Sequence, residues 1–128
     1  MSLILLVDDH EPLRTTMTDL LQHMGHGVLT AADGRQALAK QKQTPANVLL
    51  TDIFMPEMDG LELIQEFRRL YPNVKIIALS GGMTNRPGGP YLHMAEKFGA
   101  QWVLPKPFSV KQLDEVIRAA TAEETPAA

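Results

Sequence analysis

The sequence predicts an α/β domain with five helices on both faces of a doubly wound, five-stranded parallel sheet. Five short apolar segments alternate along the chain with five segments of helical spacing. The segments at 3–7 and 48–50 are uninterrupted apolar runs, which are typical of strands buried on both faces. Every connection between predicted strands is long enough for a helical crossover, which parallel strands require. These three observations are the basis for the predicted sheet.

The first predicted strand, at residues 3–7, leads into an amphipathic helix. Pro12 suits the first turn of this helix, and Gly25 ends its pattern. Apolar residues recur in it at helical spacing: Leu13, Met17, Leu20, Leu21 and Met24. Residues 27–31 form the second predicted strand.

The second helix is predicted from a capping box. Asp33 is the acid at the N-cap, and Gln36 stands three residues later. The helix runs to about Gln43, and its apolar face is mostly alanine, so we expect it to be loosely held. Residues 48–52 form the third strand.

The third helix follows a second capping box, formed by Asp59 and Glu62. It ends before Pro72, and it is predicted to bury Leu63, Ile64, Phe67 and Leu70. The fourth strand, 75–79, ends at Ser80.

The stretch 81–90 contains four glycines and two prolines, which identifies it as a loop. A short helix at 91–98 follows and is closed by Gly99. Residues 102–104 are the fifth strand.

The last helix is capped by Ser109, with Gln112 at its third position.

The chain has 128 residues, enough for one domain with a full core. We therefore expect a single domain over residues 1–121 and a disordered tail at 122–128.

Composition excludes several kinds of site. The chain has no cysteine, so it has no disulfide, no thiolate nucleophile and no cysteine-based zinc site. A net charge of −3 gives no general attraction to nucleic acids or anionic membranes. No apolar run approaches the length of a membrane span, and the first residues lack the features of a signal peptide. The expected location is the cytoplasm.

Five polar side chains are predicted to meet at one edge of the sheet. They follow or end four different strands: Asp8, Asp9, Asp52, Ser80 and Lys106. Ligands of open α/β sheets bind at the carboxyl ends of the strands, which is where all five residues fall.

The chemistry of this set favours phosphoryl transfer. Three crowded carboxylates repel one another unless a cation shares the site. Oxygen ligands without histidine or cysteine favour a hard cation, of which Mg²⁺ fits best and Mn²⁺ is an alternative. Asp52 would form an aspartyl phosphate, and Lys106 would offset the charge that develops on the transferred group.

Taken singly, each of these residues has a simpler interpretation. Asp8 and Asp9 can serve as helix caps, and a strand-end residue such as Asp52 or Ser80 is more often part of a turn. A lone Lys106 is usually a solvated surface residue. The functional prediction therefore depends on the conjunction of all four strand ends.

Four motifs carry a resemblance to a known family. They are Val7-Asp8-Asp9, Asp52-x-x-Met55-Pro56-x-Met58-Asp59-Gly60, Leu79-Ser80-Gly81 and Lys106-Pro107-Phe108. Over residues 2–121 the chain resembles the response-regulator receiver domains of bacterial two-component signalling. The resemblance implies a flavodoxin-like sheet of strand order 2-1-3-4-5. It also implies a signalling domain that catalyses only its own Mg²⁺-dependent phosphorylation and dephosphorylation, rather than an enzyme.

The resemblance implies a role for each site residue. Asp52 would accept the phosphoryl group from a histidine kinase or a phosphotransfer protein. Mg²⁺ would be held by Asp9, Asp52 and the backbone carbonyl of Phe54, with Asp8 acting through water.

Phosphoryl oxygens would be contacted by Ser80, the Gly81 amide and Lys106. The Lys106–Pro107 peptide bond resembles one that is commonly cis in the family. The output surface would be the fourth helix, fifth strand and fifth helix, which would bind an output protein of unknown identity. A homodimer through the same surface is left open.

Two features depart from the family pattern. The family often has an aromatic switch residue three positions before the lysine, where this chain has Val103. The aromatic Trp102 comes one residue earlier, and adjacent strand residues face opposite ways, so Trp102 takes over the role only if a bulge shifts it. The loop after Ser80 is also long and rich in glycine, and we expect it to be mobile and to become ordered on phosphorylation.

Three rival functions are weighed against this prediction. An aspartyl-phosphate phosphohydrolase of the haloacid-dehalogenase type would carry a second aspartate at position 54, where this chain has Phe54. A flavin-binding module on the same fold would need a phosphate-binding loop after the first strand, which is missing. A receiver-like module that binds partners without phosphorylation is disfavoured by the intact set of acids.

Overall fold

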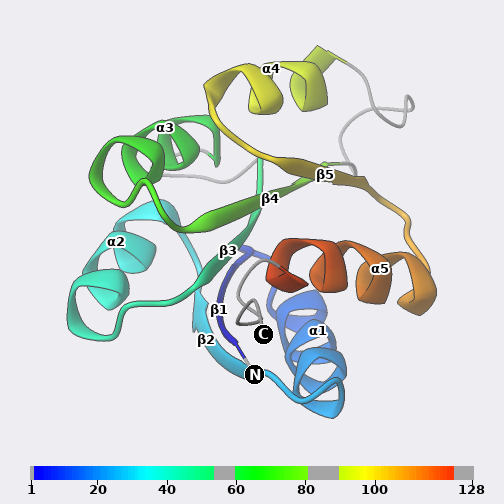
Figure 1. Ribbon diagram of the computed structural model, residues 1–128. Coiled ribbons are helices and arrows are strands. Elements are labelled where there is room, and N and C mark those ends of the chain that lie inside the picture. Colours follow the sequence, from blue (N-terminus) through cyan, green and yellow to red (C-terminus); the bar gives the residue numbers. More distant parts are fainter. Residues whose placement is uncertain (1, 54–59, 81–89, 123–128) are drawn as a thin grey trace.

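The computed structural model describes residues 2–53, 60–80 and 90–122, with only the backbone of residues 80 and 90–93. The strands are β1 (Leu3–Val7), β2 (Gly27–Ala31), β3 (Val48–Asp52), β4 (Lys75–Ser80) and β5 (Trp102–Pro105). The helices are α1 (Glu11–His23), α2 (Gly34–Gln43), α3 (Gly60–Leu70), α4 (Pro90–Phe98) and α5 (Val110–Thr121). Strands and helices alternate, as predicted (Figure 1).

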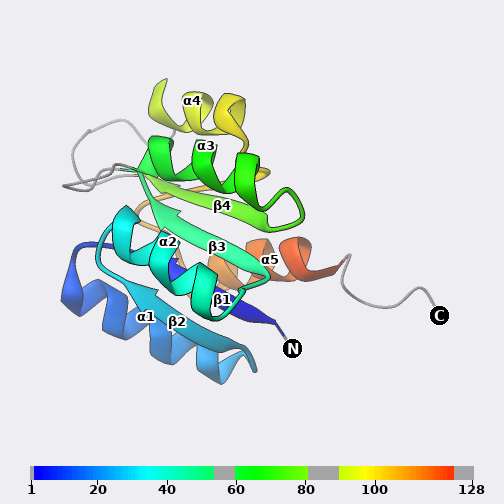
Figure 2. The same ribbon diagram turned by 90° about the vertical axis from the view of Figure 1, so that its left-hand side faces the viewer.

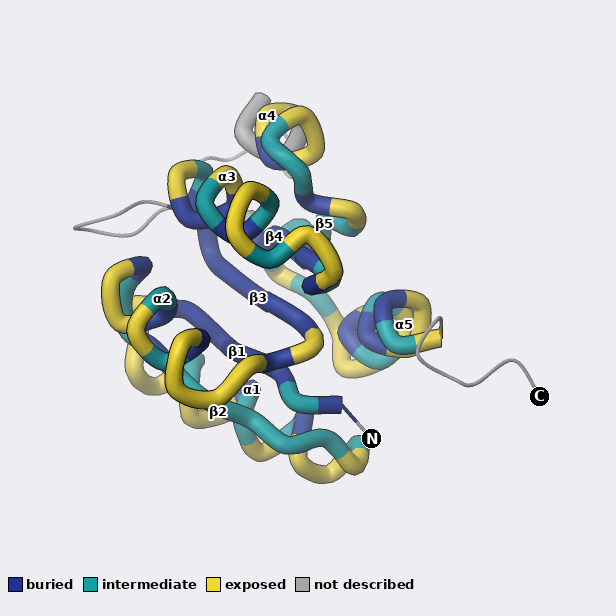
Figure 3. The backbone as a smooth tube through the Cα atoms, turned by 60° about the vertical axis from the view of Figure 1, so that its left-hand side comes forward, coloured by how far each residue is buried: buried dark blue, intermediate teal, exposed yellow. Residues whose placement is uncertain are grey.

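The five strands form one parallel sheet in the order β2-β1-β3-β4-β5, which confirms the predicted topology. Helices α1 and α5 cover one face, and α2, α3 and α4 cover the other (Figures 1 and 2). The central strand β3 is buried along its whole length, whereas the edge strand β2 is mostly half-buried (Figure 3).

Alternate residues of each central strand enter two separate cores. In β1, Leu5 and Val7 pack on the side of α2, α3 and α4, whereas Ile4 and Leu6 pack on the side of α1 and α5. A strand with helices on both faces has no solvent-facing side, so apolar residues are favoured on both of its faces. The uninterrupted apolar runs in the sequence have this cause.

Helix ends agree closely with the sequence, but the predicted burial of Leu70 at the end of α3 is wrong, because Leu70 is 44% exposed. Ser109 and Gln112 form a complete capping box at the start of α5. The Asp33 carboxylate accepts a hydrogen bond from the Gln36 amide, but the Gln36 side chain accepts from the Ala32 amide, so the second half of the predicted box is displaced by one residue. Gly25 and Gly99 both have positive φ, 95° and 130°, which lets them end α1 and α4 as predicted.

Helix α2 has more attachments than its alanine-rich face suggested. Gln41 is buried, and its side-chain amide both accepts from and donates to the backbone of Ala46, at 3.0 and 3.3 Å. Lys40 donates to the Thr30 carbonyl of edge strand β2. How tightly α2 is held stays a prediction, but these polar contacts were not predicted from the sequence.

Three expectations lie outside the described residues. These are the Asp59 half of the capping box before α3, the loop at 81–90 except for Pro90, and the tail beyond Ala122. Within the part of the chain that is described, no helix has the length and hydropathy needed to cross a membrane.

Candidate functional site

The carboxyl ends of β1 and β3 bring three carboxylates together. Asp52 is the last residue of β3, and Asp8 and Asp9 directly follow β1, the strand that pairs with it. One carboxylate oxygen from each lies within 4.8 Å of the others. Asp8 is fully buried and Asp52 is 7% exposed, whereas Asp9 is exposed. The cluster is therefore open to solvent on the side of Asp9.

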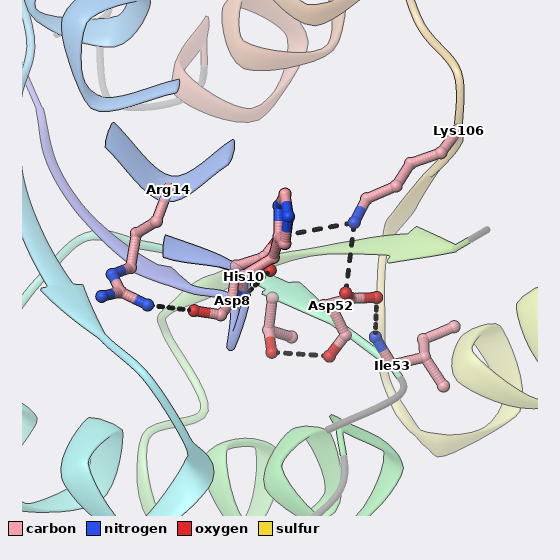
Figure 4. A network of polar contacts seen from close by, with 7 residues as sticks. Asp8, His10, Arg14, Asp52, Ile53 and Lys106 are labelled. Atoms are coloured by element: carbon pink, nitrogen blue, oxygen red, sulfur yellow. Dashed lines mark hydrogen bonds and ion pairs between the residues drawn. The ribbon is translucent and has the colours of Figure 1, made fainter. Parts of the chain in front are cut away.

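Lys106 reaches this cluster from the end of β5. Its Nζ atom lies 3.1 Å from Oδ2 of Asp52 and 3.3 Å from Oδ2 of Asp8 (Figure 4). The Lys106–Pro107 peptide bond is cis. The ammonium group thus balances part of the charge of two buried carboxylates.

The Asp52 side chain is fixed by the backbone that follows it. Oδ1 accepts a hydrogen bond of 2.8 Å from the Ile53 amide, and the Asp52 carbonyl accepts one of 2.9 Å from Thr51 Oγ1. Burial raises the pKa of the Asp52 carboxyl above its ordinary value; Lys106 opposes this shift and the charge of Asp8 adds to it. The carboxylate is therefore held in an environment that disfavours its negative charge.

Asp8 is held by three hydrogen bonds in addition to its contact with Lys106. Its amide donates to the Ala31 carbonyl at 3.1 Å. Its Oδ1 accepts from the His10 amide at 2.8 Å, and its carbonyl accepts from Nη1 of Arg14 at 2.7 Å (Figure 4). Both its backbone and its carboxylate are thus fixed, and the contact with Arg14 was not predicted from the sequence.

Gly60 lies against the backbone of the site. Its amide donates to the Ile53 carbonyl at 2.7 Å. A Cβ atom at this position would lie 2.1 Å from the Asp52 carbonyl oxygen and 2.5 Å from the Ile53 Cα atom. Glycine is required here because the first turn of α3 packs directly on the residues that carry Asp52. The sequence placed Gly60 in a helix start but did not reveal this contact.

Three predicted site residues lie wholly or partly outside the described residues. Ser80 ends β4 and pairs with Pro105, so its backbone lies at the same edge of the sheet, but its side chain is outside the described residues. Phe54 and Gly81 also lie outside them. Their roles stay predictions.

Trp102 and Val103 face opposite sides of the sheet. Trp102 packs with the core on the side of α1 and α5, and Val103 packs with the core on the side of α4. No bulge brings Trp102 to the α4 side, because β4 and β5 pair residue by residue from Ile77–Trp102 to Ser80–Pro105. Any switch role of either residue stays a prediction.

The donor set fits a hard divalent cation. All three side chains offer carboxylate oxygen, and two of them are buried next to each other, where a cation would relieve their repulsion. The exposed Asp9 leaves room for the water ligands that Mg²⁺ retains.

Comparison with known proteins gives the family. The sequence profile of the response regulator receiver domain matches residues 4–118. The chain belongs to this family. This match confirms the predicted resemblance. Receiver domains are signalling domains of two-component systems.

Individual relatives agree with this assignment. The DNA-binding transcriptional regulator NtrC of Azospirillum brasilense is 33% identical over 125 residues, which are 98% of this chain and 25% of that protein. The crystal structure of chemotaxis protein CheY4 of Vibrio cholerae has a TM-score of 0.83 and 31% identity, covering 94% of this chain and 98% of that one. A receiver domain from Clostridium thermocellum has a TM-score of 0.87 at 26% identity, with 97% of both chains covered.

The chain spans less than half the length of several curated relatives. It covers 12% of the sensor kinase CckA of Brucella abortus and 44% of a receiver protein of Anaeromyxobacter. Receivers related to this one thus occur in kinases and in regulators.

Proposed function

We propose that Asp52 is the phosphoacceptor of this receiver domain. A histidine kinase or a phosphotransfer protein would supply the phosphoryl group from a phosphohistidine. The carboxylate oxygen of Asp52 forms the new O–P bond as the N–P bond to the donor imidazole breaks. The observation that carries this proposal is the contact of Lys106 with both Asp52 and Asp8 at the edge of the sheet.

The proposed cation site consists of Asp8, Asp9, Asp52 and the Phe54 carbonyl. Mg²⁺, or Mn²⁺ in its place, would neutralise charge on the carboxylates and on the phosphoryl oxygens. The close approach of three carboxylate oxygens supports this site.

Lys106 is proposed to stabilise the charge of the transferred group. Its ammonium is already within 3.3 Å of two carboxylate oxygens, so it needs little movement to reach a phosphoryl oxygen on Asp52. Ser80 and the Gly81 amide are proposed to bind the remaining oxygens. These contacts would draw the end of β4 inward and change the relative stability of two arrangements of the loop and of α4.

The proposed output surface is formed by α4, β5 and α5. Met94 on α4 is 38% exposed and Val110 on α5 is 54% exposed, so this side carries apolar groups available to a partner. The partner is an output protein or a second copy of the chain, and nucleic acid is not proposed as a ligand of this domain. The cytoplasmic location stays a prediction from the sequence.

The experiment is incubation with phosphoramidate or acetyl phosphate and Mg²⁺, followed by intact-protein mass spectrometry. One added phosphoryl group is expected in the wild type and none in Asp52→Asn. Asp114→Asn is the matched control, because Asp114 is a surface acid paired with Arg118 on α5 and should leave labelling unchanged.

The same mass measurement, together with an assay of phosphomonoester hydrolysis, separates the two alternative functions. A protein that stays unmodified, while another receiver is labelled under the same conditions, would indicate a binding module that works without phosphorylation. Turnover of diverse phosphomonoesters would indicate a phosphohydrolase.

A further inference from the structure

Arg14 lies outside the acid cluster but is bonded to its backbone. We propose that Arg14 is a positioning residue, which holds the Asp8–Asp9 peptide so that both carboxylates face Asp52 and thereby strengthens cation binding. This inference depends on the cation site of the proposed function.

The contact with Arg14 acts on two acids at once. Its Nη1 atom donates to the Asp8 carbonyl at 2.7 Å. A peptide unit is planar, so fixing the direction of that carbonyl also fixes the Asp9 amide and restricts where the Asp9 side chain can point. The second fixed point is the His10 amide, which donates to Oδ1 of Asp8 at 2.8 Å. Asp9 is thus bracketed by one bond before it and one after it.

Arg14 itself is anchored in helix α1. Its amide donates to the His10 carbonyl at 2.9 Å, and its carbonyl accepts from Thr18 Oγ1 at 2.8 Å. The guanidinium group is a rigid, planar donor, so it holds the Asp8 carbonyl in a fixed direction better than a flexible ammonium would. Figure 4 shows Arg14 and Lys106 approaching Asp8 from different elements, α1 and the segment after β5.

The side chain of Arg14 is replaceable without leaving a buried cavity. It is half-buried and lines an open surface hollow together with Glu11, Thr15, Thr18, Asp19 and Thr30. Truncation should therefore leave the fold intact.

Arg14→Ala should change the affinity for a divalent ion through two effects of opposite sign. Removing a positive charge near a cation site should tighten binding of a divalent ion, because the Coulomb repulsion between the two is lost. Loss of a positioning contact should weaken it, and partners of metal ligands typically contribute about tenfold or more to affinity. The sign of the change in the dissociation constant thus distinguishes the two effects.

The test is Mn²⁺ titration of the full chain without any phosphoryl donor, with free Mn²⁺ measured by electron paramagnetic resonance. We expect Arg14→Ala to bind about tenfold more weakly than wild type. Arg14→Lys, which keeps the charge and can offer a single hydrogen bond, should fall between them. Arg118→Ala, an exposed arginine in the last turn of α5, makes the same change in net charge and should leave the dissociation constant unchanged.

Urea unfolding without metal is the second measurement, and it shows whether each variant folds. If Arg14→Ala bound Mn²⁺ as well as wild type or more tightly, Arg14 would be a structural residue only, and the inference would be overturned while the cation site stood. If Arg14→Ala did not fold, Arg14→Lys would decide: wild-type affinity would overturn the inference. A wild-type protein that bound no Mn²⁺ would overturn the cation site itself, and with it this role of Arg14.

Discussion

Asp52 is a carboxylate held where its negative charge is unfavourable. It is buried and lies in one cluster with Asp8. Among the groups that shift its pKa, only Lys106 carries a positive charge. Such an environment is typical of functional groups, because stability alone would favour a neutral residue there.

The raised pKa of Asp52 predicts a stabilising substitution. A raised pKa means that the folded protein binds this proton more readily than the unfolded chain. The resulting stability is fully present below the ordinary pKa and is lost as pH rises through the raised pKa. Without metal, Asp52→Asn should therefore be more stable than wild type above that pKa.

Urea unfolding of both proteins from acidic to neutral pH checks this prediction. The difference in free energy of unfolding should shrink as pH falls, because protonation removes the unfavourable charge from the wild type. A variant less stable than wild type at neutral pH would contradict the stated environment of Asp52.

Substitution of Lys106 should have opposite effects on metal binding and on phosphorylation. Its ammonium lies where it competes with a cation for Asp8 and Asp52. Lys106→Met should bind Mn²⁺ more tightly, by about tenfold or roughly 1.4 kcal/mol, yet accept a phosphoryl group more slowly. Mn²⁺ titration and the rate of labelling by phosphoramidate measure the two effects, and weaker Mn²⁺ binding would contradict the competition.

At the scale of elements, the start of α3 is tied most closely to the site. Gly60→Ala would place a Cβ atom 2.1 Å from the Asp52 carbonyl oxygen, where only backbone movement can relieve the clash. We expect a loss of about 3 kcal/mol in the free energy of unfolding, together with slower labelling of Asp52.

Gly27→Ala is the matched control for Gly60→Ala. A Cβ atom at Gly27 would lie 3.2 Å from the flexible end of Leu3, so little or no destabilisation is expected in urea unfolding. Equal losses in the two variants would show that the contact of Gly60 with Asp52 has no special importance.

Most elements were predictable because their signals are local. Capping at Ser109, the helix-ending glycines and the apolar runs each depend on neighbouring residues, and the structure confirms them. The buried amide of Gln41 and the close approach of Gly60 were not predicted, because they depend on how one element packs against another. Trp102 and Val103 were assigned to opposite faces by strand alternation alone.

At the scale of the molecule, the parallel sheet explains why residues far apart in the sequence meet. Strands that all run in one direction place their carboxyl ends at one edge, so Asp8, Asp52 and Lys106 converge although up to 98 positions separate them. This convergence followed from strand order. The hydrogen bond of Arg14 to the Asp8 carbonyl did not, because it depends on the rotamer of one long side chain.

The assignment of Asp52 as the phosphoacceptor is tested by locating the modified residue. Borohydride reduction of an acyl phosphate leaves homoserine in place of the modified aspartate, and peptide mass spectrometry then identifies its position. After treatment with phosphoramidate and Mg²⁺, we predict homoserine at position 52 and unmodified aspartate at positions 8 and 9. Homoserine at either of those positions, or none at position 52 in a protein that gained mass, would contradict the assignment of Asp52 as the phosphoacceptor.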